Sequence, residues 1–365
     1  MANHQTIVAL ETFVCPIPPL DSLPCPYTLH SYERTHISEI HERIAQATVL
    51  LVTTIPIRAD ALDVTVSPHL RAIVVMASGT NNIDLHVCAQ RGVVVMNSPG
   101  ANANSVAQHA LTLLLAARRQ LIPSHVATVG LDQKDDEESQ WEKKGTLMMM
   151  LRNTRDNRFP IALKEEIIGI IGYGIVGKLR SIYLIHRPIP SLSNGRIGKL
   201  VADMCRALGM TVIVADRKNP STSTITSGDR VPFEEVLRKS TAVVLCVPLT
   251  SSTMNLISVA ELQLMGEQSL LINVSRGGVV NEDALAEALK SGSIGGAATD
   301  VFAKEPASST TSPLLRADVR NTNLTVTPHL AWLAQSTIGN YQRVLIENLC
   351  SFFDNKPINV VAAVA

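Results

Sequence analysis

The stretch Ile167–Lys178, IIGIIGYGIVGK, runs from a short apolar segment into a glycine-rich turn, and its glycines Gly172, Gly174 and Gly177 have the spacing GxGxxG. In such a turn the first glycine permits a tight bend, the second lets backbone N–H groups approach a pyrophosphate, and the third lets the next helix pack closely on the strand. The N-terminus of that helix adds a partial positive charge that favours phosphate. The stretch therefore predicts a strand, a turn and a helix that bind a dinucleotide.

A carboxylate that binds the adenosine ribose is expected at the end of the following strand. The run TVIVAD ends at Asp216, but this residue lies about 40 positions after Gly177, where the motif expects about 20. The tripeptide Gly-Lys-Leu at 177–179 recurs at 198–200, and removal of residues 178–198 leaves GYGIVGKLVADMCRALGMTVIVAD with the usual spacing. We therefore hypothesise that residues 178–198 are a retained intron or another gene-model error.

The alternative is a genuine surface loop that repeats these three residues by chance. In that case the helix would begin later, and Gly195 and Gly198 would replace Gly174 and Gly177. Sequencing the mature transcript decides between the two, because a messenger that keeps these codons rejects the intron. A chain inactivated by the interrupted phosphate turn is a third alternative.

The bulk properties restrict the class of protein. A chain of 365 residues is long for one core, which predicts two domains. Lys plus Arg and Asp plus Glu both number 32, so the neutral chain gives no reason to expect nucleic acid or a membrane surface as a partner. Six cysteines lack metal-ligand spacing, so we expect no metal site and reduced thiols in the cytoplasm.

Short apolar runs alternate with helical patterns along most of the chain, which predicts parallel sheets covered by helices. Six runs from Ile167 onward match a doubly wound nucleotide-binding domain, and a helix over 336–353 is expected to return to the first part of the chain. We therefore predict two Rossmann-like, doubly wound α/β domains. Residues 121–333 form the dinucleotide-binding domain, and residues 1–120 plus 334–365 form a discontinuous, flavodoxin-like substrate domain.

Three further motifs each follow a strand-like run: NVSRGGVV with Arg276, DVFAKEP with Glu305 and TPHLAW with His329. Side chains in these positions project from the carboxyl edge of a parallel sheet, where ligands bind in open α/β folds. An arginine can bind a carboxylate through two hydrogen bonds. A histidine beside a carboxylate can deliver and remove a proton near neutral pH. Taken singly, each of the three could equally be a structural residue.

These motifs resemble those of the D-isomer-specific 2-hydroxyacid dehydrogenases, the family that includes glycerate, formate and phosphoglycerate dehydrogenases. The resemblance covers Ile7–Val361 and rests on motifs in the order of the family: ASGTNNIDL, NSPGANANSVAQHA, GYGIVGK, CVPLT, NVSRGGVV, DVFAKEP and TPHLAW. It implies that His329 is the acid/base, that Glu305 pairs with it and that Arg276 binds the 2-oxo acid.

The resemblance also implies contacts with both ligands. Asp300 matches the position that orients the nicotinamide carboxamide, and Pro248 lies in a loop that lines the cofactor. Ser78 and Gly79 match the turn whose backbone N–H groups bind the substrate carboxylate, and Asn102 matches a polar residue on the substrate side. An ordinary strand-to-helix turn would also account for the serine and the glycine.

The activity implied is reversible hydride transfer between a nicotinamide cofactor and a small 2-oxo acid or D-2-hydroxy acid. The turn at Gly79 carries no lysine or arginine for a phosphate, which favours hydroxypyruvate or glyoxylate. Asp216 favours NAD, whereas Arg217 and Lys218 leave NADP open. Relatives of this kind are commonly dimers, so a homodimer is expected. The alternative from a different class is an NAD(H)-sensing co-regulator of the same fold, which would bind the cofactor without turnover.

Overall fold

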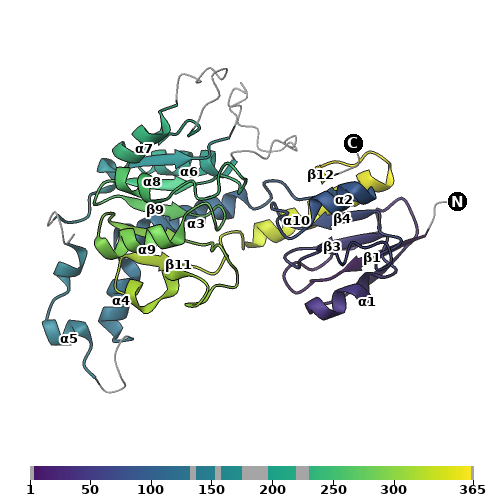
Figure 1. The fold of residues 1–365 in the computed structure, drawn as a ribbon, viewed down its shortest axis with the longest axis horizontal. Coiled ribbons are helices and arrows are strands. Elements are labelled where there is room, and N and C mark those ends of the chain that lie inside the picture. Colours follow the sequence, from purple (N-terminus) through teal and green to yellow (C-terminus); the bar gives the residue numbers. More distant parts are fainter. Residues whose placement is uncertain (1–3, 132–136, 153–157, 175–195, 219–229, 363–365) are drawn as a thin grey trace. The chain divides into compact units, whose positions relative to one another are not determined.

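The computed structural model describes residues 4–131, 137–152, 158–174, 196–218 and 230–362. Its contacts divide the chain into two compact units, each built on a six-stranded sheet (Figure 1). The first unit takes its described residues from Met1–Asn102 and Leu333–Ala365, and the second from Ala103–Ile182 and Asn194–Trp332.

The first sheet has the strand order β12-β5-β4-β3-β1-β2. Its strands are β1 (Gln5–Ala9), β2 (Tyr27–Ser31), β3 (Val49–Val52), β4 (Ala72–Val75), β5 (Val94–Met96) and β12 (Val360–Ala362). The five strands β1 to β5 are parallel and follow the expected flavodoxin-like order 2-1-3-4-5, whereas β12 runs antiparallel to β5. The apolar runs predict β1, β3, β4 and β5. They miss β2, which is largely exposed and lacks an apolar run, and the short β12 at the other edge of the sheet.

Helices cover both faces of the first sheet. Helices α1 (Ile40–Ile44) and α2 (Leu85–Arg91) bury Ile44 and Cys88 against alternate strand residues. The remaining strand residues point to the other face, and the long helix α10 (Gln335–Phe353) packs on β4 and buries Tyr341. The helix expected over 336–353 thus returns to the first sheet, and this unit is discontinuous in sequence as expected.

The second sheet has the strand order β11-β10-β9-β8-β6-β7, and all its strands are parallel. They are β6 (Ile167–Ile171), β7 (Thr211–Val214), β8 (Ala242–Leu245), β9 (Leu270–Asn273), β10 (Gly296–Thr299) and β11 (Leu324–Val326). Each corresponds to one of the six predicted runs. Beyond β7 a single parallel bridge joins Ala215 to Val231, in the place of the third strand of the 3-2-1-4-5-6 order. Strands β6 and β7 follow one another toward one edge of the sheet, whereas β8 to β11 follow one another toward the other edge. The strand order therefore reverses between β6 and β8, which makes that point the topological switch.

Helices lie on both faces of this sheet as well (Figure 1). Helices α3 (Ala103–Arg118) and α6 (Arg196–Ala207) pack together on one face. Helices α7 (Phe233–Lys239), α8 (Val259–Leu264) and α9 (Glu282–Ser291) cover the other. Short 3₁₀ turns occur at Ile37–Glu39, Met148–Leu151, Leu163–Glu165, Pro313–Leu315 and Ala317–Val319. No helix within the described ranges is long and apolar enough to cross a membrane.

The boundary between the two units differs from the expected one at residue 120. Helix α3 contacts α6 and strands β9, β10 and β11, and its residues Leu113, Leu114 and Ala117 are buried in the core of the second unit. The second unit therefore begins at Ala103, because the apolar face of α3 is buried against the second sheet.

The segment after α3 contains two helices. Helix α4 (Leu121–Val129) contacts α5 (Gln140–Lys144), which begins with a capping box formed by Ser139 and Glu142. The capping box supplies partners for backbone N–H groups at the start of α5, which stabilises this short helix in a charged stretch of the chain.

Candidate functional site

The glycine turn after β6 has the backbone that its sequence predicts. Gly172 and Gly174 have φ values of +104° and +79°, which favour glycine. A Cβ added to Gly172 would lie 2.5 Å from the carbonyl carbon of Cys246, in the loop after β8. The turn thus lies at the switch point between β6 and β8 with its backbone packed too closely for a side chain. This geometry fits the cradle that a dinucleotide requires.

Gly198 occupies the helix position that close packing on the strand requires. It lies in the first turn of α6, and an added Cβ would lie 2.6 Å from the carbonyl oxygen of Gly172 and 3.1 Å from Ile170. This is the contact that the third glycine of the motif serves. Gly177 and Gly195, with most of the suspected insertion, lie outside the described residues. Of the alternates named from the sequence, the structure thus places Gly198 against the strand.

Asp216 directly follows the end of β7, where a carboxylate for the adenosine ribose is expected. Its Oδ1 accepts a hydrogen bond from the backbone N–H of Arg217 at 2.9 Å. Two cations, Arg217 and Lys218, follow Asp216 in the sequence. Lys218 forms an ion pair with Glu261 at 2.8 Å. Pro248 is exposed in the loop after β8.

Arg230 is a residue of this region that sequence reasoning missed. Its guanidinium donates hydrogen bonds to the carbonyl oxygens of Gly174 and Ala215, so that it joins the glycine turn to the end of β7. No local motif marks the residue, since only the return of the chain to the Ala215 bridge brings it there.

Arg276, Glu305 and His329 follow the neighbouring strands β9, β10 and β11, and the structure brings them together. The Nδ1 atom of His329 lies 2.7 Å from Oε2 of Glu305, and the other carboxylate oxygen accepts the N–H of Phe302 at 2.9 Å. The positive charge of Arg276 acts on the same carboxylate. A cation, a carboxylate and an imidazole thus meet at the carboxyl edge of one sheet.

The environment of Glu305 lowers the pKa of its carboxyl group below the ordinary 4.5. Partial burial is the largest single influence and raises this pKa. The hydrogen bond from His329, the hydrogen bond from Phe302 and the charges of His329 and Arg276 together outweigh it. Glu305 is therefore ionised at neutral pH and accepts the Nδ1 proton of His329.

Gly277 explains how the loops that bear Arg276 and Glu305 come so close. A Cβ at Gly277 would lie 1.7 Å from the carbonyl oxygen of Phe302, so any side chain there would separate the two loops. The adjoining Asn273 supports the arginine loop, because its amide donates to the carbonyl of Arg276 at 3.1 Å and its Oδ1 accepts the N–H of Ser275.

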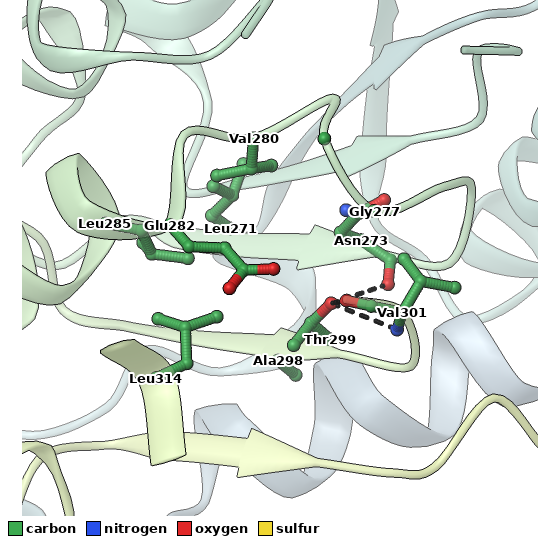
Figure 2. Close-up of a pocket in the computed structure, with 11 residues that line it drawn as sticks. Leu271, Asn273, Gly277, Val280, Glu282, Leu285, Ala298, Thr299, Val301 and Leu314 are labelled. Atoms are coloured by element: carbon green, nitrogen blue, oxygen red, sulfur yellow. Dashed lines mark hydrogen bonds between the residues drawn. The ribbon is translucent and has the colours of Figure 1, made fainter. Parts of the chain in front are cut away.

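A small pocket of about 10 Å³ lies beneath these loops, between β9, β10 and α9 (Figure 2). Figure 2 shows Thr299 bonded to Asn273 and Val301 at one end and the Glu282 carboxylate at the other. Glu282 also accepts hydrogen bonds from the N–H of Ala303 and the hydroxyl of Ser312. The volume suits about one water molecule, so this pocket belongs to the scaffold that supports the site.

Asp300 is almost fully buried, and its carboxylate is used within the protein. Its carboxylate accepts hydrogen bonds from the hydroxyl of Thr327 at 2.6 Å and from the N–H groups of Leu330 and Ala331, both at 2.9 Å. These contacts use three of the about four acceptor positions of a carboxylate. The position that the resemblance gives to the nicotinamide carboxamide therefore also holds the loop that carries His329.

In the first unit, Ser78 and Gly79 follow β4, and Ser78 lies within hydrogen-bonding distance of Asn102 at 2.8 Å and of the carbonyl of Ser98 at 3.0 Å. The carbonyl of Ser78 accepts a hydrogen bond from Asn97 at 2.7 Å, and the fully buried Asn348 of α10 donates to the carbonyl of Asn97. The last helix thus supports this turn through two asparagines that sequence reasoning missed.

Comparisons with known proteins agree with this geometry. The family model described as "D-isomer specific 2-hydroxyacid dehydrogenase, NAD binding domain" matches residues 189–331. Glycerate dehydrogenase of Methylorubrum extorquens is 32% identical over 340 residues, which cover 93% of each chain. Glyoxylate reductase of Thermococcus gammatolerans is 33% identical over 257 residues, which cover 70% of this chain and 67% of that protein.

A solved structure shows the same fold. The NADPH-dependent glyoxylate/hydroxypyruvate reductase of Sinorhizobium meliloti superposes with a TM-score of 0.68 at 24% identity and covers 98% of both chains. With two compact α/β units, a glycine turn at the switch point and the Arg276, Glu305 and His329 cluster, the chain belongs to the D-isomer-specific 2-hydroxyacid dehydrogenase family, whose members are NAD(P)-dependent oxidoreductases.

Proposed function

We propose that this protein catalyses reversible hydride transfer between NAD(P)H and a small 2-oxo acid, with the D-2-hydroxy acid as product. The observation that carries the proposal is the 2.7 Å contact between His329 and an ionised Glu305, next to the charge of Arg276. The relatives named as glycerate dehydrogenase and glyoxylate reductase support it.

His329 is the proton donor in the direction of reduction. Because its Nδ1 is bonded to Glu305, the ring nitrogen left for substrate is Nε2. Protonated His329 delivers the Nε2 proton to the carbonyl oxygen of the 2-oxo acid, and in the reverse direction Nε2 removes it from the hydroxyl group. The bound nicotinamide supplies or accepts the hydride.

Arg276 binds the substrate and stabilises the developing oxyanion. A guanidinium presents two parallel N–H groups to a carboxylate, which fixes the 2-oxo acid in one orientation. In the first unit, we propose that the backbone N–H groups of Ser78 and Gly79 bind the substrate carboxylate and that Asn102 lies on the substrate side. No lysine or arginine occurs in the MASGT turn, which favours an unphosphorylated acid such as hydroxypyruvate or glyoxylate.

Replacement of His329 tests the reaction. In His329→Ala we expect kcat for hydroxypyruvate reduction to fall by at least about 100-fold, because general acid catalysis contributes that much. NADH binding, followed by fluorescence, should stay within a factor of two. His69→Ala is the matched control, since His69 is an exposed histidine of the first unit. If His329→Ala turns over substrate at the wild-type rate with an unchanged pH profile, His329 is not the proton donor.

The same assay addresses the co-regulator alternative. Tight NADH binding with no turnover of hydroxypyruvate, glyoxylate or other 2-oxo acids would favour a sensor of NAD(H). The similarity to dehydrogenases and reductases favours the enzyme.

We propose NAD as the preferred cofactor. Asp216 would repel a 2′-phosphate, and Lys218 is engaged by Glu261. In Asp216→Ser, the ratio of kcat/KM for NADH to that for NADPH should fall by about tenfold or more, because the repelling charge is gone. Lys218→Met should leave this ratio unchanged. A ratio below one in the wild-type protein would contradict the preference.

We propose that a second copy of this chain covers the apolar side chains that are exposed on residues 121–131, 137–152 and 158–163. These side chains are Leu121, Ile122, Val129, Leu131, Trp141, Met148, Met149, Phe159 and Leu163. Exposed apolar side chains concentrated in one part of a chain favour an interface, and two-fold dimers are the commonest assembly. Light scattering should give a dimer for the wild type and a monomer for Trp141→Glu combined with Met148→Glu, whereas Ile37→Glu should remain dimeric. A monomeric wild type at micromolar concentration would contradict the proposal.

The cytoplasm is the proposed location. All six cysteines are free thiols, and burial raises the pKa of Cys15 and Cys88 to about 11, which keeps these two thiols protonated and unreactive. Free thiols of this kind suit a reducing compartment. Microscopy of the tagged protein in its source cells would test the location, and a signal confined to a membrane-bounded compartment would contradict it.

A further inference from the structure

A hydrogen-bond chain connects helix α3 to the loop that carries His329. The Nε2 atom of His109, in α3, lies 3.0 Å from the hydroxyl oxygen of Thr327, and 3.6 Å from Oδ1 of Asp300. His109 is the polar member of an otherwise apolar helix face that includes Val106, Ala110 and Leu113. A polar side chain placed among core residues needs a partner, and Thr327 supplies it.

The chemistry of the threonine fixes the direction of the chain. A hydroxyl has one proton, and Thr327 donates that proton to Asp300 Oδ1 at 2.6 Å. Thr327 must therefore accept from His109, so Nε2 of His109 carries a proton. The order of donation is His109 to Thr327 to Asp300.

The end of this chain lies at the catalytic loop. Asp300 accepts the N–H groups of Leu330 and Ala331 through its carboxylate and that of His329 through its backbone carbonyl at 2.8 Å. His329 itself has a φ of +56°, a left-handed conformation that costs a non-glycine residue energy and persists only where the surroundings impose it. Asp300 is 1% exposed, and no lysine or arginine of the described residues forms an ion pair with it.

We propose that His109 is a positioning residue for catalysis: through Thr327 and Asp300 it holds the left-handed turn that presents His329 to Glu305. The inference rests on the proposed function, since it gives His329 its role. It adds a residue from a helix about 190 to 220 positions earlier in the chain than the loop it controls. A histidine that only satisfied its own polar atoms would not need a partner that passes the bond on to Asp300.

Four variants test the chain of donation. His109→Leu removes the donor and Thr327→Val removes the relay, whereas His109→Gln keeps an N–H donor and Thr327→Ser keeps the hydroxyl. We expect His109→Leu to lower kcat for hydroxypyruvate reduction about tenfold, with KM for NADH unchanged, because a displaced proton donor slows the chemical step more than binding. His109→Gln and Thr327→Ser should stay within about threefold of wild type.

A double-variant cycle provides the sharper readout. If His109 acts through Thr327, the double variant His109→Leu with Thr327→Val should be no slower than the slower single variant. Multiplicative effects would show that the two residues act independently and would overturn the inference. Equal losses in His109→Leu and His109→Gln would overturn it as well. Gln108→Ala, at an exposed position of the same helix, should leave kcat unchanged.

A measurement without turnover separates failure of the inference from failure of the proposed function. The imidazole N–H proton of His329, assigned by its loss in His329→Gln, reports the bond to Glu305 in an NMR spectrum. It should shift or broaden in His109→Leu and remain in place in His109→Gln. An unchanged signal in His109→Leu rejects the positioning role even in a protein that turns over no 2-oxo acid, whereas a shifted signal there supports the role and leaves only the reaction in question.

Discussion

Glu305 divides its two oxygens between the backbone and the imidazole. One oxygen accepts the N–H of Phe302 at 2.9 Å, and the other bonds Nδ1 of His329 at 2.7 Å. The first contact fixes the carboxylate, and the second fixes the ring, so that one residue sets the position of the proposed proton donor.

The lowered pKa of Glu305 predicts the sign of one pH effect. Since folding lowers this pKa below 4.5, the charge of Glu305 stabilises the fold above that pH, and the contribution is lost as the pH falls through the folded-state pKa. Between about pH 7 and about pH 3, the free energy of unfolding of the wild type should therefore fall by more than that of Glu305→Gln, which has no carboxylate to protonate. Urea denaturation at the two pH values measures the difference, and equal losses in the two proteins would contradict the coupling.

At the scale of elements, the packing of α6 on β6 depends on one glycine. In Gly198→Ala the new methyl group meets the carbonyl oxygen of Gly172 at 2.6 Å, so the helix must move away from the turn. We expect the dissociation constant for NADH to rise by about tenfold or more, because the helix N-terminus no longer faces the phosphates. Gly339→Ala in α10 is the control, since a Cβ there meets nothing within 4 Å and should not weaken binding. Equal NADH binding by Gly198→Ala and wild type would reject the assignment.

A buried ion pair joins the opposite ends of the same elements. Arg118, the last residue of α3, bonds both oxygens of Glu166 at 2.5 and 3.0 Å and also reaches the carbonyl oxygens of Thr241 and Gln268. One guanidinium thus ties α3 to the segments that enter β6, β8 and β9. Both partners are almost fully buried.

Removal of one partner of this pair should be costly. We expect Glu166→Ala to lower the free energy of unfolding by about 3–5 kcal/mol, because it leaves the charge of Arg118 buried without its carboxylate. Urea denaturation measures the loss. Asp203→Ala, which breaks an exposed pair with Lys199, should cost less than about 1 kcal/mol. A loss for Glu166→Ala as small as that of the control would show that the pair does not stabilise the fold.

At the scale of the whole molecule, the suspected insertion and the fold can be reconciled. Deletion of residues 178–198 joins Gly177 to Lys199, so Gly177 takes the position that Gly198 holds in α6. The match of the family model begins only at residue 189, inside that stretch. The shortened chain therefore keeps a glycine at this position and every residue of α6 from Lys199 onward.

We expect the chain without residues 178–198 to fold and to bind NADH about tenfold more tightly than the full chain, because the phosphate turn regains its short connection to the helix. Titration of both proteins with NADH measures the difference, and circular dichroism verifies the fold. Weaker binding by the shortened chain would indicate that residues 178–198 contribute to the site.

Local patterns along the chain predict the six strands of the second unit, the glycine turn and the cluster of Arg276, Glu305 and His329. They suffice because each motif is local and because parallel strands bring their carboxyl ends to one edge. The exposed edge strand β2 carries no such pattern. The folded chain alone establishes which sheet α3 covers, which glycine packs on β6, and how His109 and Arg230 reach the site. Each depends on contacts between residues far apart in the chain, and no local spacing records such contacts.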